Sequence, residues 1–193
     1  MKAVQTLPEG YWEIYSCDLK QDKKLALLVN GIALAITVAL LLLGRCFVPM
    51  WELSSLFRHK GMLPVLLVIF GLLVAYIILH EAVHGLAMKI VGTTKVRYGF
   101  TGAYAYAGSD DYYNKKAYIF IALAPVVLWG IVLAVACALV PLQWFWVIYF
   151  VQLQNLGGAA GDFYVTVKFS RFSKDILVRD YGVGMKVFDK KQL

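Results

Sequence analysis

The sequence predicts an all-α membrane protein with about four transmembrane helices and a short cytosolic β-hairpin between the second and third. Composition is the first reason, because the 193 residues are 61% hydrophobic and 16% charged, whereas soluble proteins contain about 45–50% apolar residues. The apolar residues also gather in four long runs, and one polar stretch between them alternates in the manner of a hairpin. We expect residues 1–193 to form one membrane-embedded domain.

Four apolar segments each approach or exceed the roughly 20 residues that a helix needs to cross a bilayer. They cover residues 25–43, 62–91, 117–140 and 144–167. Pro125 lies inside the third segment, where its missing N–H should kink the helix or open its backbone toward a cavity. Gly92, after the second segment, is a natural C-cap.

The basic residues predict the orientation of these helices. Sixteen of the 19 Lys and Arg residues fall in the N-terminal segment, the 89–116 loop or the C-terminal tail, and three fall in the opposite loops. Because basic loops stay in the cytosol, both termini are expected there. The first 24 residues mix both charges and lack the apolar core of a signal peptide. We therefore expect a multi-pass protein of the bacterial cytoplasmic membrane.

Composition also excludes some classes of partner and site. The net charge of +7 is accompanied by no nucleic-acid recognition motif, and contact with the anionic lipid of the bilayer explains it more simply. Cys17, Cys46 and Cys137 form no spaced pair, so neither a disulfide framework nor a cysteine metal site is predicted. The sequence does not indicate the oligomeric state.

The second apolar segment carries His80, Glu81 and His84 in the order His-Glu-x-x-His. In a helix the two histidines lie one turn apart on one face, so both imidazoles can bind one metal ion. Glu81 is then placed to accept a proton from a zinc-polarised water. Ionisable side chains cost about 2.5–3.5 kcal/mol each at the centre of a membrane helix on insertion scales, which a bound dication would offset.

Asp162 is the candidate for a third ligand. No glutamate follows Glu81, and the remaining histidine, His59, is expected on the other side of the membrane. The other downstream aspartates lie in polar stretches, whereas Asp162 lies inside the fourth apolar segment. At about 1.5 Å rise per residue, His80, His84 and Asp162 should lie at similar depths. The alternative is that Asp162 contributes only to helix packing.

Asn155 precedes Asp162 by seven residues, which is about two helical turns, and so lies on a similar face. Its amide could donate a hydrogen bond to a substrate carbonyl or to an oxyanion, which makes it a candidate catalytic residue. The alternative is a hydrogen bond between packed helices.

The sequence HEAVHG in one apolar segment and the later N-x-x-G-x-x-G-D from Asn155 to Asp162 resemble the intramembrane zinc proteases of the site-2 protease type. The similarity is greatest to a bacterial family of zincin peptidases, which are short four-helix membrane proteins. This resemblance implies that His80, His84 and Asp162 bind zinc and that Glu81 is the catalytic base. It covers most of the chain from the first apolar segment onward.

Residues 96–98 and 103–106 alternate small and larger side chains and are separated by Gly99 and Gly102. This pattern predicts a short hairpin. The resemblance implies that a strand here can pair with an extended substrate, and the alternative is a solvated loop with tyrosines at the membrane interface. The C-terminal tail could lie on the membrane surface or pair with the hairpin.

Together these features predict a zinc-dependent intramembrane endopeptidase that cuts transmembrane or membrane-proximal segments near the cytosolic face. Its partners would be a membrane protein or peptide substrate and the lipid bilayer. The alternative class is a metal-binding membrane scaffold, sensor or transporter without peptidase activity. A transporter should line a path with further polar residues, yet the outer halves of the segments are almost purely apolar.

Overall fold

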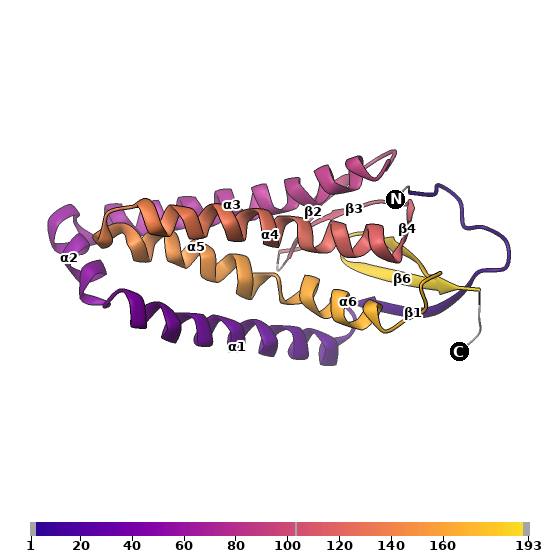
Figure 1. The fold of residues 1–193 in the computed structure, drawn as a ribbon, viewed down its shortest axis with the longest axis horizontal. Helices are drawn as coiled ribbons and strands as arrows, with labels where there is room; N and C mark the ends of the chain where they lie inside the picture. The colour runs from indigo at the N-terminus through magenta and orange to yellow at the C-terminus, as the bar shows by residue number, and fades with distance from the viewer. Residues whose placement is uncertain (1–2, 103, 191–193) are drawn as a thin grey trace. The chain divides into compact units, whose positions relative to one another are not determined.

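The computed structural model describes residues 3–102 and 104–190 and is mostly helical (Figure 1). The helices are α1 (Lys23–Phe47), α2 (Trp51–Lys60), α3 (Met62–Ile90), α4 (Lys115–Leu139), α5 (Phe145–Gly158) and α6 (Ala160–Ser170), with a short 3-10 turn η1 (Leu142–Trp144) before α5. The strands are β1 (Trp12–Asp18), β2 (Arg97–Phe100), β3 (Ala105–Gly108), β4 (Tyr112–Asn114), β5 (Leu177–Asp180) and β6 (Gly184–Asp189).

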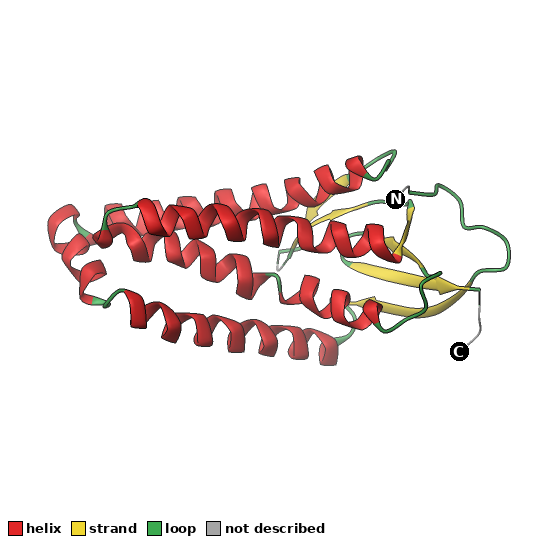
Figure 2. Cartoon of the chain, in the orientation of Figure 1, coloured by secondary structure: helices red, strands yellow, loops and turns green. Residues whose placement is uncertain are grey.

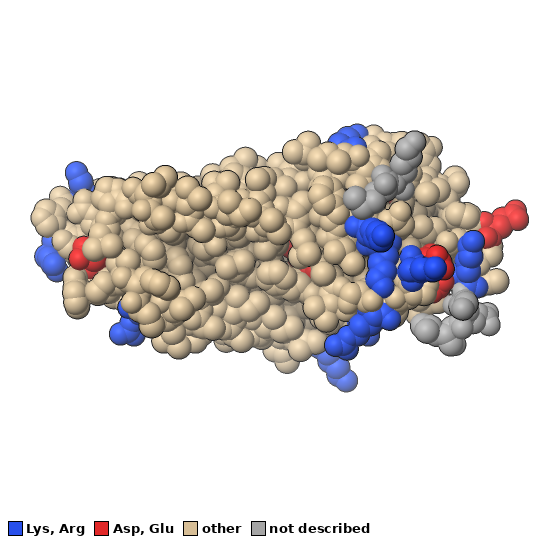
Figure 3. Space-filling view, in the orientation of Figure 1, with Lys and Arg blue, Asp and Glu red and all other residues tan. Residues whose placement is uncertain are grey.

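Within the described residues, three helices are long and apolar enough to cross a membrane. These are α1, α3 and α4, with 25, 29 and 25 residues, and they correspond to the first three predicted segments. Their visible surfaces carry almost no charge, whereas Lys and Arg side chains gather near the strands (Figure 3). Gly92 follows α3 with a φ of 92°, a conformation that ends helices and favours glycine.

The fourth predicted segment, residues 144–167, is two helices in the structure. α5 ends at Gly158, Ala159 leaves the helical conformation with a φ of −81° and a ψ of 16°, and α6 begins at Ala160. Consecutive glycines weaken a helix at this point. Gly157 also allows a close approach to α1, because a Cβ there would lie 2.2 Å from Thr37 Oγ1. With 14 and 11 residues, each helix alone is shorter than the roughly 20 residues that a span requires.

A four-stranded antiparallel sheet corrects the expectation of an all-α fold (Figure 2). Its order is β1-β6-β5-β4, so the polar N-terminal segment and the C-terminal tail pair with each other. The register runs from Trp12 opposite Asp189 to Asp18 opposite Gly184. β4 pairs with β5 and is followed immediately by α4. The tail therefore belongs to this sheet, which corrects the expectation that it lies on the membrane surface or pairs with the hairpin.

A second, two-stranded antiparallel sheet lies between α3 and α4 in the chain. β2 pairs with β3, with Arg97 opposite Gly108 and Phe100 opposite Ala105. The predicted strands were residues 96–98 and 103–106, and residue 103 lies outside the described residues. Asp110, after β3, accepts hydrogen bonds from Arg97 on β2 and Arg179 on β5. These bonds lower the pKa of the Asp110 carboxyl to about 2 and link the two sheets.

The described residues form two compact units. Unit 1 comprises residues 1–29, 80–125 and 161–193, and unit 2 comprises residues 30–79 and 126–160. All the strands belong to unit 1, where those of the four-stranded sheet share one apolar core with the adjoining parts of α3, α4 and α6. The buried residues of this core include Met88, Val91, Tyr113, Tyr118, Ile121, Val165, Phe169, Val178 and Val187. Unit 2 has its own core around Leu56, Val65, Trp146 and Val147.

Phe169→Ala should lower the free energy of unfolding by about 3–5 kcal/mol, because it leaves a cavity in the core of unit 1. The Phe169 side chain is fully buried. Thermal unfolding of the full chain in detergent would measure the loss. Val167→Ala on the same helix is the control, since Val167 is 55% exposed and its truncation should change stability little. Equal losses in the two variants would contradict the packing of α6 described here.

Candidate metal centre

The last third of α3 presents two histidines on one face. His80 and His84 are four residues apart, and their ring centroids are 4.8 Å apart with the planes inclined at 79°. The surrounding segment is continuously apolar, and α3 runs unbroken through both positions. His80 is buried and His84 is half-buried, so neither imidazole is freely solvated.

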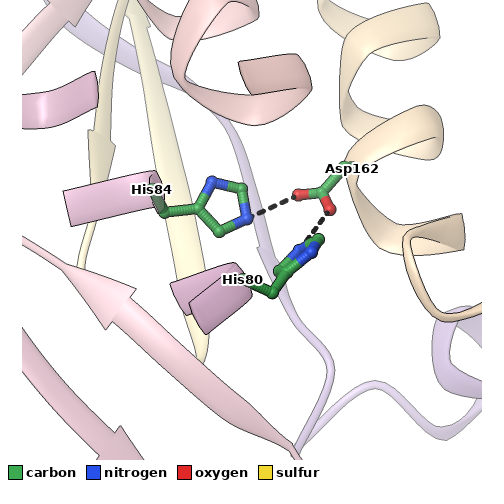
Figure 4. A group of neighbouring side chains, drawn as sticks. All are labelled: His80, His84 and Asp162. Carbon is green, nitrogen blue, oxygen red and sulfur yellow. Dashed lines mark ion pairs between the residues drawn. The ribbon is translucent and has the colours of Figure 1, made fainter. Parts of the chain in front are cut away.

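Asp162 reaches these histidines from the first turn of α6 (Figure 4). Its Oδ2 lies 3.5 Å from His80 Nε2, and its Oδ1 lies 3.6 Å from His84 Nε2. One ligand atom from each residue lies within 4.8 Å of the other two. A carboxylate in the first turn of a helix is also favoured by the helix dipole. The structure therefore brings together the three residues that the sequence predicted as metal ligands.

The donor set and the two distances at Asp162 fit zinc. Two imidazole nitrogens and one carboxylate oxygen are ligands that catalytic zinc sites use, with a fourth position left open. Ligands about 2.1 Å from zinc in tetrahedral geometry are roughly 3.4 Å apart. The two nitrogen-to-oxygen distances at Asp162, 3.5 and 3.6 Å, are close to that value.

The second ring nitrogen of His84 has its own partner. His84 Nδ1 lies 3.0 Å from the carbonyl oxygen of Ile121 in α4. A carbonyl can only accept, so Nδ1 carries the hydrogen and the lone pair lies on Nε2, which faces Asp162. Histidine ligands of metals are commonly oriented by such a bond from the other ring nitrogen. No sequence pattern identifies Ile121 as this partner, because the acceptor is a backbone atom.

Glu81 lies beside the three candidate ligands. Its carboxylate interacts electrostatically with His84, His80 and Asp162, and with the backbone of Ala107 in β3. The β2–β3 hairpin also contacts α3 near the motif, since a Cβ on Gly85 would meet the hydroxyl of Tyr98 at 1.9 Å. Glu81 and Gly85 are one turn apart and share a face. The hairpin therefore covers the face of α3 that carries Glu81.

Asp180, which lies in a polar stretch of the sequence, is a half-buried carboxylate near this site. Its Oδ2 accepts a hydrogen bond from the hydroxyl of Tyr118, and its Oδ1 accepts one from the backbone N–H of Gly182, each at 2.9 Å. Burial raises the pKa of the Asp180 carboxyl to about 6, and its charge interacts with those of His84 and Asp162. No sequence pattern marks Asp180 as part of this region, because its position depends on where β5 lies in unit 1.

Asn155, the predicted oxyanion donor, belongs to unit 2. It is fully buried, and its Oδ1 accepts a hydrogen bond from Tyr76 at 2.9 Å. Its Nδ2 donates to the carbonyl of Val126 at 3.3 Å and to Gln152 Oε1 at 3.4 Å. These bonds join α5 to α3 and α4 within unit 2, which agrees with the alternative that Asn155 forms hydrogen bonds between packed helices. Its catalytic role stays a prediction.

Two histidines one turn apart, a glutamate between them and a nearby carboxylate from another helix are the residue set of metallopeptidases of the His-Glu-x-x-His class. Comparison with known proteins agrees with this class. The chain belongs to the family described as "Putative zincin peptidase", whose model matches residues 73–177. That range contains His80, Glu81, His84 and Asp162.

A curated relative is also similar. It is the "Uncharacterized 24.7 kDa protein in gap 5'region" of Pyrococcus woesei, which is 28% identical over 151 residues. The match covers 76% of this chain and 64% of that protein, so this chain spans less than two thirds of the relative's length. No solved structure matches the chain.

Removal of zinc should lower the melting temperature of the full chain, because a ligand that binds only the folded state stabilises it. At free zinc about 100 times the dissociation constant, the stabilisation is about 2.7 kcal/mol. Melting in detergent with zinc and with excess EDTA measures the difference. His84→Ala should abolish the difference, whereas His59→Ala should retain it, since His59 lies in α2. Identical melting of the wild type in both conditions would refute zinc binding.

Proposed function

We propose that this chain is a zinc-dependent intramembrane endopeptidase, which hydrolyses peptide bonds of transmembrane or membrane-proximal segments near the cytosolic face. The observation that carries this proposal is the meeting of His80, His84 and Asp162 beside Glu81. These groups converge at a helix that is long and apolar enough to cross a membrane. The family description supports a zinc-dependent peptidase, and the resemblance to site-2 proteases supports the intramembrane substrate.

Different residues have different roles in the proposed hydrolysis. His80, His84 and Asp162 would hold zinc, which when bound makes water a better nucleophile and polarises the substrate carbonyl. Glu81 takes the proton from the attacking water and later gives it to the leaving amine. The backbone of Ala107 interacts with the Glu81 carboxylate and restrains it beside the ligands.

The hairpin provides a place for an extended substrate. Within the described residues β2 pairs only with β3, so its other edge has backbone groups available for a further strand. A helical substrate must unwind before water can attack its peptide bond, and pairing with β2 would replace the hydrogen bonds that unwinding breaks. Tyr98 and Phe100 on β2 are 58% and 72% exposed and could contact apolar side chains of the substrate.

We place the protein in the bacterial cytoplasmic membrane as a multi-pass protein with both termini in the cytosol. The three apolar helices support a membrane location. The two sheets and most of the Lys and Arg residues belong to unit 1 together with the metal centre. A basic surface of this kind favours the cytosolic side, where anionic lipid attracts it.

Glu81→Gln is expected to abolish cleavage while zinc remains bound, because the amide cannot accept the water proton but leaves all three ligands in place. A suitable assay reconstitutes the full chain in liposomes with reporter proteins that carry single apolar helices between two tags. The fragments are then identified by mass spectrometry. General-base removal should cost about 100- to 10,000-fold in rate.

Glu52→Gln is the matched control, since Glu52 lies in α2 and the same chemical change there should leave turnover intact. Cleavage by Glu81→Gln at the wild-type rate would remove Glu81 as the base. A wild type that binds zinc but cleaves none of the reporters would favour the metal-binding scaffold, sensor or transporter over the peptidase.

A further inference from the structure

Helix α4 contains Pro125, and the residue four positions before it is Ile121. In an uninterrupted helix the N–H of residue 125 would donate to the carbonyl of residue 121. Proline has no N–H, and its ring also pushes the carbonyl four residues earlier away from its usual direction. The carbonyl of Ile121 therefore lacks its standard helical donor.

This same carbonyl accepts the hydrogen bond from His84. Its oxygen lies 3.0 Å from His84 Nδ1, while Nε2 of the same ring lies 3.6 Å from the Asp162 carboxylate. The ring is thus held at both nitrogens, by a backbone group of α4 on one side and by the ligand cluster on the other. Both contacts lie within unit 1.

We propose that Pro125 is a positioning residue for the metal centre. By withholding the helical N–H, it leaves the Ile121 carbonyl available to His84, which fixes the imidazole in the tautomer whose Nε2 lone pair faces the metal position. The inference rests on the proposed zinc site and extends it to a residue that touches neither the metal nor a substrate. It also gives a chemical reason for a proline inside a 25-residue apolar helix.

The surroundings make this hydrogen bond difficult to replace. Ile121 and Ala122 are 1% and 3% exposed, and the His84 side chain is 12% exposed. Water therefore has little access to the carbonyl, and a histidine that lost this acceptor would have an unsatisfied N–H in an apolar environment. If residue 125 could donate, its N–H would compete with His84 for the same oxygen.

A bend in α4 is the simpler explanation for Pro125, and it predicts a different outcome. If the proline only shapes the helix, Pro125→Ala changes stability through helix propensity and leaves the intrinsic zinc affinity unaltered. If Pro125 positions His84, alanine restores the N–H and weakens zinc binding even though alanine is the better helix former. Stability and zinc affinity then change in opposite directions.

The test measures the zinc affinity of the full chain in detergent by competition with a chromophoric chelator, together with the melting temperature of the zinc-free protein. Pro125→Ala should bind zinc about 10-fold more weakly, which is the lower end of the usual effect of losing an outer partner of a ligand. The zinc-free variant should melt no lower than the wild type. Pro64→Ala, the same change near the start of α3, should leave zinc affinity unchanged.

A second variant separates the effect of the N–H at position 125 from the effect of losing the proline ring. Lactic acid incorporated at position 125 has the side chain of alanine but an ester oxygen in place of the N–H, so it should restore most of the affinity that alanine loses. Zinc affinity equal to wild type in Pro125→Ala, or equally weak in the alanine and lactic acid variants, would overturn the inference. An absence of zinc binding by the wild type would instead refute the proposed site itself.

Discussion

The interaction on which unit 1 depends is the meeting of two imidazoles and one carboxylate inside apolar helices. His80, His84 and Asp162 would each be costly to bury alone, and their approach to 3.5 and 3.6 Å offsets that cost only where a proton or a cation lies between them. A dication at the same position would compensate the carboxylate more fully. The three residues come from α3 and α6, which are separated by 69 residues in the chain. The fold must therefore hold these two helices in fixed relative positions.

The rest of unit 1 holds the two helices in these positions. Met88 near the end of α3 and Val91 just after it belong to the buried core, and Val165 and Phe169 of α6 belong to the same core. Tyr118 of α4 packs there too and bonds to Asp180 of β5. The sheet therefore connects the ends of the three helices that surround the metal centre. An apolar core fixes such positions better than polar contacts alone, because its packing allows few alternatives.

The hairpin is placed by a different kind of contact. Arg97, Asp110 and Arg179 form an exposed ion network between β2, the β3–β4 connection and β5. Exposed ion pairs contribute little stability, so the network acts mainly on the orientation of the hairpin. Together with the contact of Tyr98 at Gly85, it keeps β3 beside Glu81 and leaves the outer edge of β2 without a strand among the described residues.

The sequence alone was sufficient to predict those features that produce a local or periodic pattern of residues. Long apolar runs located α1, α3 and α4, the four-residue spacing placed His80 and His84 on one face, and the isolation of Asp162 in an apolar segment singled it out. The sheet was missed because β1 and β6 lie at opposite ends of the chain, and pairing at that distance leaves no periodic pattern in either segment alone.

Other features depend on backbone groups and side chains that no sequence pattern distinguishes from others of their kind. The break at Ala159 follows glycines that are equally typical of close helix packing. The partner of His84 is the Ile121 carbonyl, a group that every residue possesses, and only the position of Pro125 makes this carbonyl distinctive. Asp180 has no distinguishing mark in the sequence, because its hydrogen bond from Tyr118 depends on the fold.

The most direct test of the central claim is the zinc content of the purified full chain, measured by atomic emission in the wild type and in His80→Ala, His84→Ala and Asp162→Ala. We predict about one zinc per chain in the wild type, as a three-residue site with an open position implies. Each variant should lose it, and Asp175→Ala, which changes an exposed aspartate, should keep it. Zinc retained in Asp162→Ala, or absent from the wild type, would contradict the three-ligand centre.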